Sequence, residues 1–152
     1  MINYIMPKRM FSMLMLCAIL LGCGTEGPSS TMTKSDSFTS LTEKINFLNQ
    51  YVIFRRVYEE LDFDINYQNN SGGMVPGPSD WDIRIIAIVP QEQLSLWTKE
   101  LAPYAEMKNI KWLSSVPTTI DYSNIKQWYQ GNRKTVGIDP VKRIIVYRLS
   151  SN

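Results

Sequence analysis

The sequence predicts one small α+β domain, in which a mostly antiparallel sheet of about four strands carries helices on one face. Three patterns support this class. Apolar residues recur at helical spacing just after residue 40, apolar and polar residues alternate from 61 to 68, and residues 82 to 89 are rich in Ile and Val. Together with the elements predicted for the C-terminal half, the order is α-β-β-α-α-β-β, which fits an α+β domain.

The first element is expected to be a helix from Ser40 to about Phe54. Ser40 and Glu43 have the spacing of a capping box, in which each side chain accepts a hydrogen bond from the other residue's backbone N–H. Apolar residues follow at helical spacing, at Leu41, Ile45, Leu48 and Val52. Residues 55 to 60 are compatible either with a continuation of this helix or with a connection.

Two strands are predicted in the centre of the chain. Residues 61 to 68 alternate between apolar and polar side chains, as in a strand with one solvated face. Residues 82 to 89 form a short run dense in β-branched side chains, which is typical of a buried strand. The segment between them, residues 69 to 81, contains several Gly and Pro residues and is predicted to be a loop.

Two more helices are predicted further along the chain. Pro90 can occupy the first turn of a helix that runs to about Leu101. Residues 102 to 119 are less regular, with a short helical turn expected near 104 to 107. A second short helix is expected from 123 to 130, presenting Ile125, Trp128 and Tyr129.

The C-terminus is predicted to form a β-hairpin from residues 135 to 138 and 143 to 149. Asp139-Pro140 suits the turn, because Pro fixes φ and Asp can hydrogen-bond to nearby backbone. Three tryptophans have helix or strand neighbours and are expected in the core, namely Trp97, Trp112 and Trp128.

A basic pair and an apolar run mark the N-terminus. Lys8 and Arg9 precede residues 10 to 22, which as a helix reach about 20 Å, whereas the hydrocarbon core of a bilayer is about 30 Å thick. This layout is typical of a secretory signal peptide rather than of a membrane-spanning helix. The run ends in Leu20-Leu21-Gly22-Cys23, which resembles the lipobox of bacterial lipoproteins.

The resemblance to bacterial lipoproteins covers residues 1 to 23 and implies a processing route. Signal peptidase II removes residues 1 to 22, and Cys23 carries a diacylglycerol on its sulfur and an acyl chain such as palmitate on its new amino group. Two or more acyl chains hold a protein stably on a membrane. Gly24 stands where related lipoproteins retained in the inner membrane have aspartate. The resemblance therefore implies an outer-membrane anchor with a periplasmic domain, or a cell-envelope anchor in an organism with one membrane.

The mature chain is predicted to divide into a tether and a globular domain. Residues 23 to 39 comprise the lipidated cysteine and a stretch rich in Gly, Ser and Thr. Such a stretch cannot bury enough apolar surface to offset its ordering entropy, so it is expected to be a flexible tether. Residues 40 to 152 are expected to form the globular domain.

The composition of the mature chain excludes several classes of function. The sequence has no histidine, and neither cysteine remains as a free thiol, because Cys17 leaves with the signal peptide and Cys23 is acylated. Zinc sites with His or Cys ligands, Ser-His-Asp or Cys-His catalysis and disulfides are therefore all excluded. Of the 16 Lys and Arg residues, two lie in the signal peptide, which leaves 14 basic against 14 acidic residues. A neutral domain without a basic cluster argues against nucleic acid as a partner. No catalytic residue and no cofactor are predicted.

Carboxylates are the remaining side chains that can carry chemistry. Asp62 and Asp64 project from one face of the first predicted strand, and Asp80 and Asp82 flank Trp81. If the two strands pair, these four carboxylates can approach one another and bind Ca²⁺, or act as acid and base on a sugar. The alternative is a solvated strand face, which is favoured because no calcium loop with recognisable ligand spacing is present.

The loop at residues 69 to 81 is the candidate partner-binding element, because it is longer than most hairpin connections and carries apolar side chains. An anion-binding or serine-nucleophile role for Ser71 is less economical than a simple turn. The loop either binds a partner or folds back on its own core. Its candidate binding residues are Gly72, Gly73, Met74, Val75, Pro76 and Trp81.

These observations predict a lipid-anchored envelope protein with a non-enzymatic domain that binds another protein in the periplasm. One specific form is an immunity protein against a toxin delivered to the periplasm, which it resembles in size, anchor and location only. The alternative is an accessory lipoprotein for outer-membrane assembly or maintenance. A third class is a Ca²⁺-dependent glycan binder or a hydrolase that uses carboxylates alone.

Overall fold

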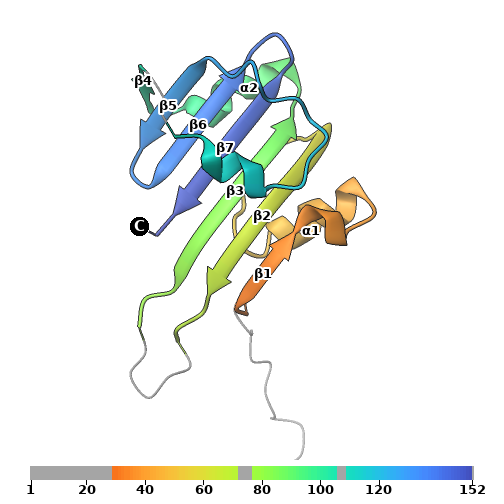
Figure 1. The fold of residues 1–152 in the computed structure, drawn as a ribbon, viewed down its shortest axis with the longest axis vertical. Coiled ribbons are helices and arrows are strands. Elements are labelled where there is room, and N and C mark those ends of the chain that lie inside the picture. Colours follow the sequence, from red (N-terminus) through yellow and green to blue (C-terminus); the bar gives the residue numbers. More distant parts are fainter. Residues whose placement is uncertain (1–28, 72–76, 106–108, 152) are drawn as a thin grey trace, which may run out of the picture.

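The computed structural model describes residues 29–71, 77–105 and 109–151 (Figure 1). These residues form one seven-stranded sheet with strand order β1-β2-β3-β7-β6-β5-β4, in which all neighbouring strands are antiparallel. The expected small antiparallel-sheet domain with helices is therefore confirmed, but about four strands was wrong, and the domain is mostly β. Among the described residues no helix is long and apolar enough to cross a membrane.

Most of the strands and helices are short, and the two longest strands, β2 and β3, have nine residues each. The strands are β1 (Thr31–Lys34), β2 (Glu60–Gln68), β3 (Asp80–Ile88), β4 (Ala102–Tyr104), β5 (Gln127–Gly131), β6 (Lys134–Asp139) and β7 (Ile144–Ser150). The α-helices are α1 (Leu41–Leu48) and α2 (Leu94–Thr98), and the 3-10 helices are η1 (Ser35–Ser37), η2 (Gln91–Gln93) and η3 (Lys111–Ser115).

The sheet consists of two meanders that meet where β3 pairs with β7. The first meander runs β1-β2-β3 and the second runs β4-β5-β6-β7. The β3–β7 pairing extends from Asp82 opposite Ser150 to Ile88 opposite Ile144. The predicted strands at 61 to 68 and 82 to 89 and the predicted C-terminal hairpin are confirmed, including the pairing of β2 with β3.

One face of the sheet, here called the α face, packs against both α-helices. Alternate residues of the central strands, such as Phe63, Ile85 and Tyr147, point into this cluster. Helix α1 contributes Leu48, and α2 contributes Trp97. The helices therefore share one face, as expected.

The opposite face, here called the η3 face, is covered by η3 and the chain that follows it. Leu113, Val116 and Ile120 pack on Ile86 and Val146, the intervening residues of β3 and β7. The cover extends over one half of the face only, because the other half carries charged side chains, which are described below. Figure 1 shows η3 lying across β7 and β3.

The ordered domain begins earlier than the sequence predicted, so the expected boundary at Ser40 is corrected. Thr31–Lys34 forms the edge strand β1, paired with β2, and Ser35 is fully buried. The Ser35 hydroxyl donates to Asp62 Oδ1 at 3.2 Å. A four-residue strand with only one apolar side chain leaves no periodic signal, and its pairing partner supplies its stability.

The first helix has the predicted cap but ends sooner than predicted. The Ser40 hydroxyl accepts from Glu43 N at 3.2 Å, and Glu43 Oε2 accepts from Ser40 N at 3.1 Å, which confirms the capping box. Helix α1 ends at Leu48 rather than near Phe54. The chain beyond it is not helical, and Arg55 adopts a left-handed backbone with φ of 53°.

Three helical predictions in the C-terminal half need correction. The helix expected from Pro90 to Leu101 is split into η2 and α2 and ends at Thr98. The helix expected from 123 to 130 is wrong, because Gln127–Gly131 is strand β5. Of the helical turn expected at 104 to 107, Tyr104 ends strand β4, and residues 106 and 107 lie outside the described residues. Trp128 of β5 is buried and lies opposite Gly137 of β6. The pairing of these two strands therefore overrides the helical spacing of the local sequence.

Gly137→Ala is expected to lower the free energy of unfolding by about 1 to 3 kcal/mol, the usual cost of overpacking a core. A Cβ at Gly137 lies 2.6 to 2.7 Å from atoms of Ile125, Trp128 and Val146, which leaves no room for it. The matched control is Gly131→Ala, whose Cβ contacts only the flexible Leu101 side chain within 3 Å. Urea denaturation measures both variants, and equal midpoints would contradict this packing.

Candidate functional site

The predicted partner-binding loop lies mostly outside the described residues. This applies to Gly72, Gly73, Met74, Val75 and Pro76. Trp81 is described and belongs to β3, where it pairs with Tyr67 of β2. The guanidinium carbon of Arg133 lies 5.8 Å from the centroid of the Trp81 ring. Trp81 is therefore a half-buried strand residue with a cation over its ring.

Three of the four predicted aspartates lie on the predicted strands and are separated by cations, whereas Asp80, which was expected in the loop at 69 to 81, is the first residue of β3. Asp62, Asp64 and Asp82 share the η3 face of β2 and β3. Arg84 NH1 lies 3.0 Å from Asp64 Oδ2, and Arg84 NH2 donates to Asp82. Lys44 Nζ of α1 lies 2.7 Å from Asp62 Oδ1. The carboxylates are thus members of ion pairs.

The remaining aspartate, Asp80, lies at the end of β3 beside polar neighbours. Its Oδ1 accepts a hydrogen bond from the Ser151 hydroxyl at 3.3 Å. Among residues 29–71, 77–105 and 109–151, no three acidic, His or Cys side chains are arranged to hold a metal ion. The Ca²⁺ interpretation of this group therefore gains no support from the geometry.

Asp82 is the centre of a charge network on the uncovered half of the η3 face. Arg148 Nε and NH2 each donate to one Asp82 oxygen at 2.9 Å, a bidentate arrangement. Burial acts to raise the pKa of Asp82, but the hydrogen bonds from Arg148 and Arg84 outweigh it, so the pKa lies below its ordinary value. Arg84 NH1 also donates to the Ser115 hydroxyl at 2.7 Å. The network therefore fastens η3 to the sheet.

A second candidate lies at the end of the sheet formed by Glu60, Ile88 and the β6–β7 turn, which we call the distal end. Three recesses, of about 520, 540 and 370 Å³, lie there, and each is lined in part by residues from the segment 117–127. Glu60 and Thr119 line both the first and the second recess, and Val141 and Lys142 line both the second and the third. The recesses therefore adjoin, and we call them together the distal groove.

The charges along the distal groove change from one end to the other. The first recess is acidic, since its only cation, Lys44, is already paired with Asp62. Its other acidic residues are Asp36 and Glu60, which have no ion pair among the described residues, and Glu59, which pairs with Arg143. The third recess has Lys126 and Lys142 at its rim, of which Lys142 is paired with Asp121, and its single carboxylate, Asp139, is buried. A ligand that fills the whole groove therefore needs a basic and an acidic part.

Val141 projects between the second and third recesses from a fixed turn. The buried Asp139 accepts hydrogen bonds at Oδ1 from Val141 N at 2.9 Å and from Lys142 N at 3.1 Å. Arg143 completes the turn with a left-handed backbone, at φ of 60°. These constraints hold the Val141 side chain in solvent, where it is 88% exposed.

Two ion pairs bracket this turn and hold it against neighbouring segments. Lys142 Nζ lies 2.6 Å from Asp121 Oδ2, and Arg143 donates to Glu59. The hydrogen bond from Lys142 lowers the pKa of Asp121, and the same bond raises the pKa of Lys142. Both side chains are exposed, so the ion pair adds little stability.

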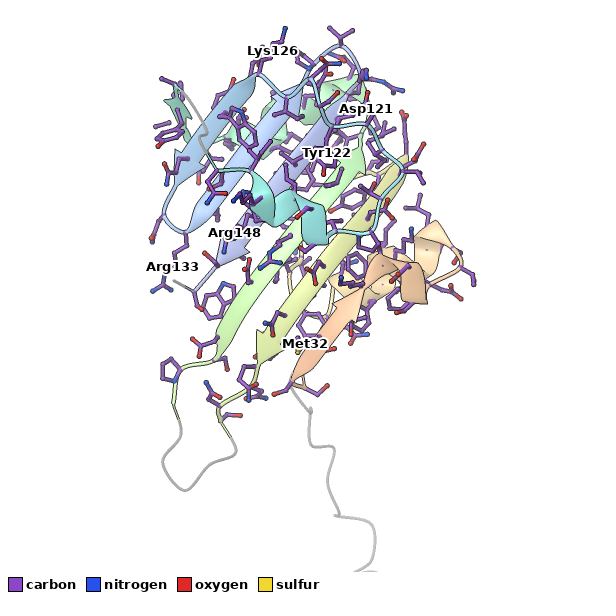
Figure 2. All side chains as sticks on the ribbon, in the orientation of Figure 1. Met32, Asp121, Tyr122, Lys126, Arg133 and Arg148 are labelled. Atoms are coloured by element: carbon purple, nitrogen blue, oxygen red, sulfur yellow. The ribbon has the colours of Figure 1, made fainter. Side chains whose placement is uncertain are left out.

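The chain enters the domain at the opposite end of the sheet. Thr31, the first residue of β1, pairs with Tyr67 near the end of β2. We call this end, where β2 leads towards β3, the proximal end. Figure 2 shows Met32 near it, and Asp121, Tyr122 and Lys126 at the other end. The described ends of the loop expected to bind a partner, residues 69–71 and 77–79, thus lie at the opposite end of the sheet from the distal groove.

The distal groove was not predicted from the sequence. Its one local signal was the Asp139-Pro140 turn, which was predicted as a turn and is confirmed by the antiparallel pairing of β6 with β7. Its other walls come from segments that only the fold brings together. Comparisons with known protein families, with curated proteins and with solved structures found no match.

Asp82→Asn is expected to reduce the free energy of unfolding by about 1 to 3 kcal/mol at pH 7, because Arg84 and Arg148 lose a charged acceptor. The pKa of Asp82 is depressed in the folded state, so its contribution is present above the unfolded value of about 3.9 and is lost as the pH falls through the folded value. The difference between wild type and variant should therefore shrink below about pH 4.

Urea denaturation at several pH values measures this difference. The control is Asp80→Asn, whose carboxylate has no ion pair among the described residues and should cost less at pH 7. A wild-type advantage over Asp82→Asn that stays constant from neutral to acidic pH would contradict the role assigned to the network.

Proposed function

We propose that the mature chain is a lipid-anchored envelope protein whose domain binds another protein without catalysing a reaction. The sequence supports the anchor through the lipobox that ends in Cys23, and its lack of histidine argues against histidine-dependent nucleophilic catalysis and against zinc sites with histidine ligands. The proposed location is the periplasmic face of the outer membrane. The membrane and one protein are the proposed partners, and nucleic acid is not.

The observation that carries this proposal is the placement of the distal groove opposite the point where the chain enters the domain. Cys23 precedes Thr31 by eight residues, which reach at most about 29 Å when fully extended. Strand β2, with nine residues, spans about 30 Å from the proximal to the distal end. An acylated Cys23 therefore favours an orientation with the proximal end towards the membrane and the distal groove towards the periplasm.

The chemistry of the distal groove suits a protein partner better than a small molecule. Its recesses adjoin along a surface rather than forming one closed cavity, and its rim carries both signs of charge. Protein interfaces combine a central apolar contact with a polar rim, and an anchoring side chain often fills a partner's pocket. Val141 has the position and exposure of such an anchor.

An immunity protein against a periplasm-delivered toxin is the specific form that we favour, and an accessory lipoprotein for outer-membrane assembly or maintenance is the alternative. Both use the same surface, but they differ in the partner. The immunity form binds a secreted toxin, whereas the accessory form binds a resident membrane complex in cells that contain no toxin. The Ca²⁺-dependent glycan binder and the carboxylate-only hydrolase are less well supported, because Asp62, Asp64 and Asp82 are engaged by cations.

A photo-crosslinking side chain at Val141 is expected to capture a discrete protein partner when the full chain is produced in its native host. The matched control is the same side chain at Met32, which is 85% exposed but lies near the proximal end, whereas Val141 is 88% exposed. Gel analysis followed by mass spectrometry identifies the adduct. Identical adducts from both positions, or none from Val141, would count against the proposal.

A further inference from the structure

A small pocket on the α face lies apart from the distal groove and shares no lining residue with it. It has a volume of about 190 Å³. Its walls include three aromatic rings, those of Phe54, Trp97 and Tyr147, whose centroids are 5.0 to 5.7 Å apart. The aromatic rings form an apolar wall of the pocket, and they come from three segments that are far apart in the sequence.

Cations dominate the charged groups of this pocket. Arg56, Lys99 and Lys134 line it, together with a single carboxylate, that of Glu100. Lys99 and Lys134 are exposed, and neither forms an ion pair with another described residue. The excess of positive charge favours an anionic ligand.

Two residues of this pocket, Arg56 and Trp97, also carry a hydrogen-bond donor that has no acceptor among the described residues. Arg56 NH1 and NH2 donate to Phe54 O at 3.1 Å and to Leu96 O at 3.0 Å, and the guanidinium carbon lies 5.9 Å from the centroid of the Trp97 ring. Arg56 Nε and Trp97 Nε1 are shielded from solvent and have no partner among the described residues, and Trp97 is only 5% exposed. Burial raises the pKa of Tyr147 to about 12, so its phenol stays protonated and can donate. A ligand that only accepts hydrogen bonds matches this wall.

Backbone strain is concentrated around the same pocket. Four described residues other than glycine have positive φ angles, and three of them are in the pocket or next to a pocket residue in sequence. Glu100 lines the pocket, Arg55 precedes Arg56, and Arg133 precedes Lys134. Left-handed backbone at such residues costs energy and is often found at binding sites.

We infer that this pocket binds a carboxylate carried by a group about as large as an amino-acid side chain. The donors and cations select the carboxylate, the aromatic walls select an apolar or aromatic body, and the volume is below the usual range of about 300 to 1,000 Å³ for ligand pockets, which limits its size. The carboxylate belongs either to a free small acid or to a protein chain, as an acidic side chain or a C-terminus. The inference does not depend on the distal groove or on the lipid anchor.

Nuclear magnetic resonance tests this inference through the indole N–H signal of Trp97, assigned by its loss in Trp97→Phe. Benzoate is the free-acid probe, and benzamide is its neutral counterpart. A peptide ending in phenylalanine with a free carboxylate, and the same peptide amidated, represent the protein-borne source. We expect saturable shifts of the Trp97 signal with benzoate, the free-carboxylate peptide or both, at concentrations up to about 10 mM, and none with either amide.

The double variant Lys99→Gln, Lys134→Gln is expected to weaken binding at least about tenfold, because it removes two charge-assisted contacts. Both side chains are exposed, so the fold should persist, and thermal unfolding checks this. The control variant Lys34→Gln, Lys111→Gln changes two exposed lysines that line neither the pocket nor the distal groove, and it should bind as the wild type does.

The outcomes are decisive in both directions. A peptide that binds at least about tenfold more tightly than benzoate identifies a protein chain as the source, and the opposite order identifies a free acid. The inference is overturned if neither carboxylate probe shifts the Trp97 signal, if the amides bind equally well, or if the Lys99 and Lys134 substitutions leave binding unchanged.

Discussion

The pairing of β3 with β7 is the constraint on which the rest of the structure depends. It joins two meanders whose strands are otherwise connected to their own sequence neighbours, and it extends from Asp82–Ser150 to Ile88–Ile144. Both strands are buried on both faces over much of their length, so the two hydrophobic clusters share these strands as a common wall. The same pairing brings the β6–β7 turn beside the start of β2, which creates the distal groove. The candidate site therefore exists only when the two meanders have docked.

One half of the η3 face is packed with apolar side chains, and the other half carries a network of charged side chains. Towards the distal end, Ile86 and Val146 are covered by η3 and the chain after it. Towards the proximal end, Asp82, Arg84 and Arg148 form a network that satisfies most of their charged groups without an apolar cover. Partly buried ion pairs are a weak source of net stability but a strong constraint on geometry. The network thus explains how one half of a sheet face can stay uncovered while η3 keeps its position.

The elements that could be predicted from the sequence are those with a clear local pattern of their own. The alternation in β2, the apolar run in β3 and the Ser40–Glu43 capping box are local signals, and all three are confirmed. The strands β1, β4 and β5 were missed because each has five residues or fewer and depends on its neighbour for pairing. Asp62, Asp64 and Asp82 were placed on the correct strands, whereas Asp80 was expected in the loop and begins β3. The ion pairs depend on register, since Asp64, Arg84 and Arg148 become cross-strand neighbours only after β2, β3 and β7 align.

The central functional claim is that acylation of Cys23 holds the domain at a membrane with its proximal end nearer the lipid. The stretch of sequence between Cys23 and the sheet is shorter than the predicted tether, because β1 already belongs to the sheet. Mass spectrometry of the N-terminal peptide from protein isolated from its native host tests the claim most directly. The account predicts a peptide that begins at Cys23 and carries a diacylglycerol and an amide-linked acyl chain. An unmodified Cys23, with residues 1 to 22 still attached, would contradict it.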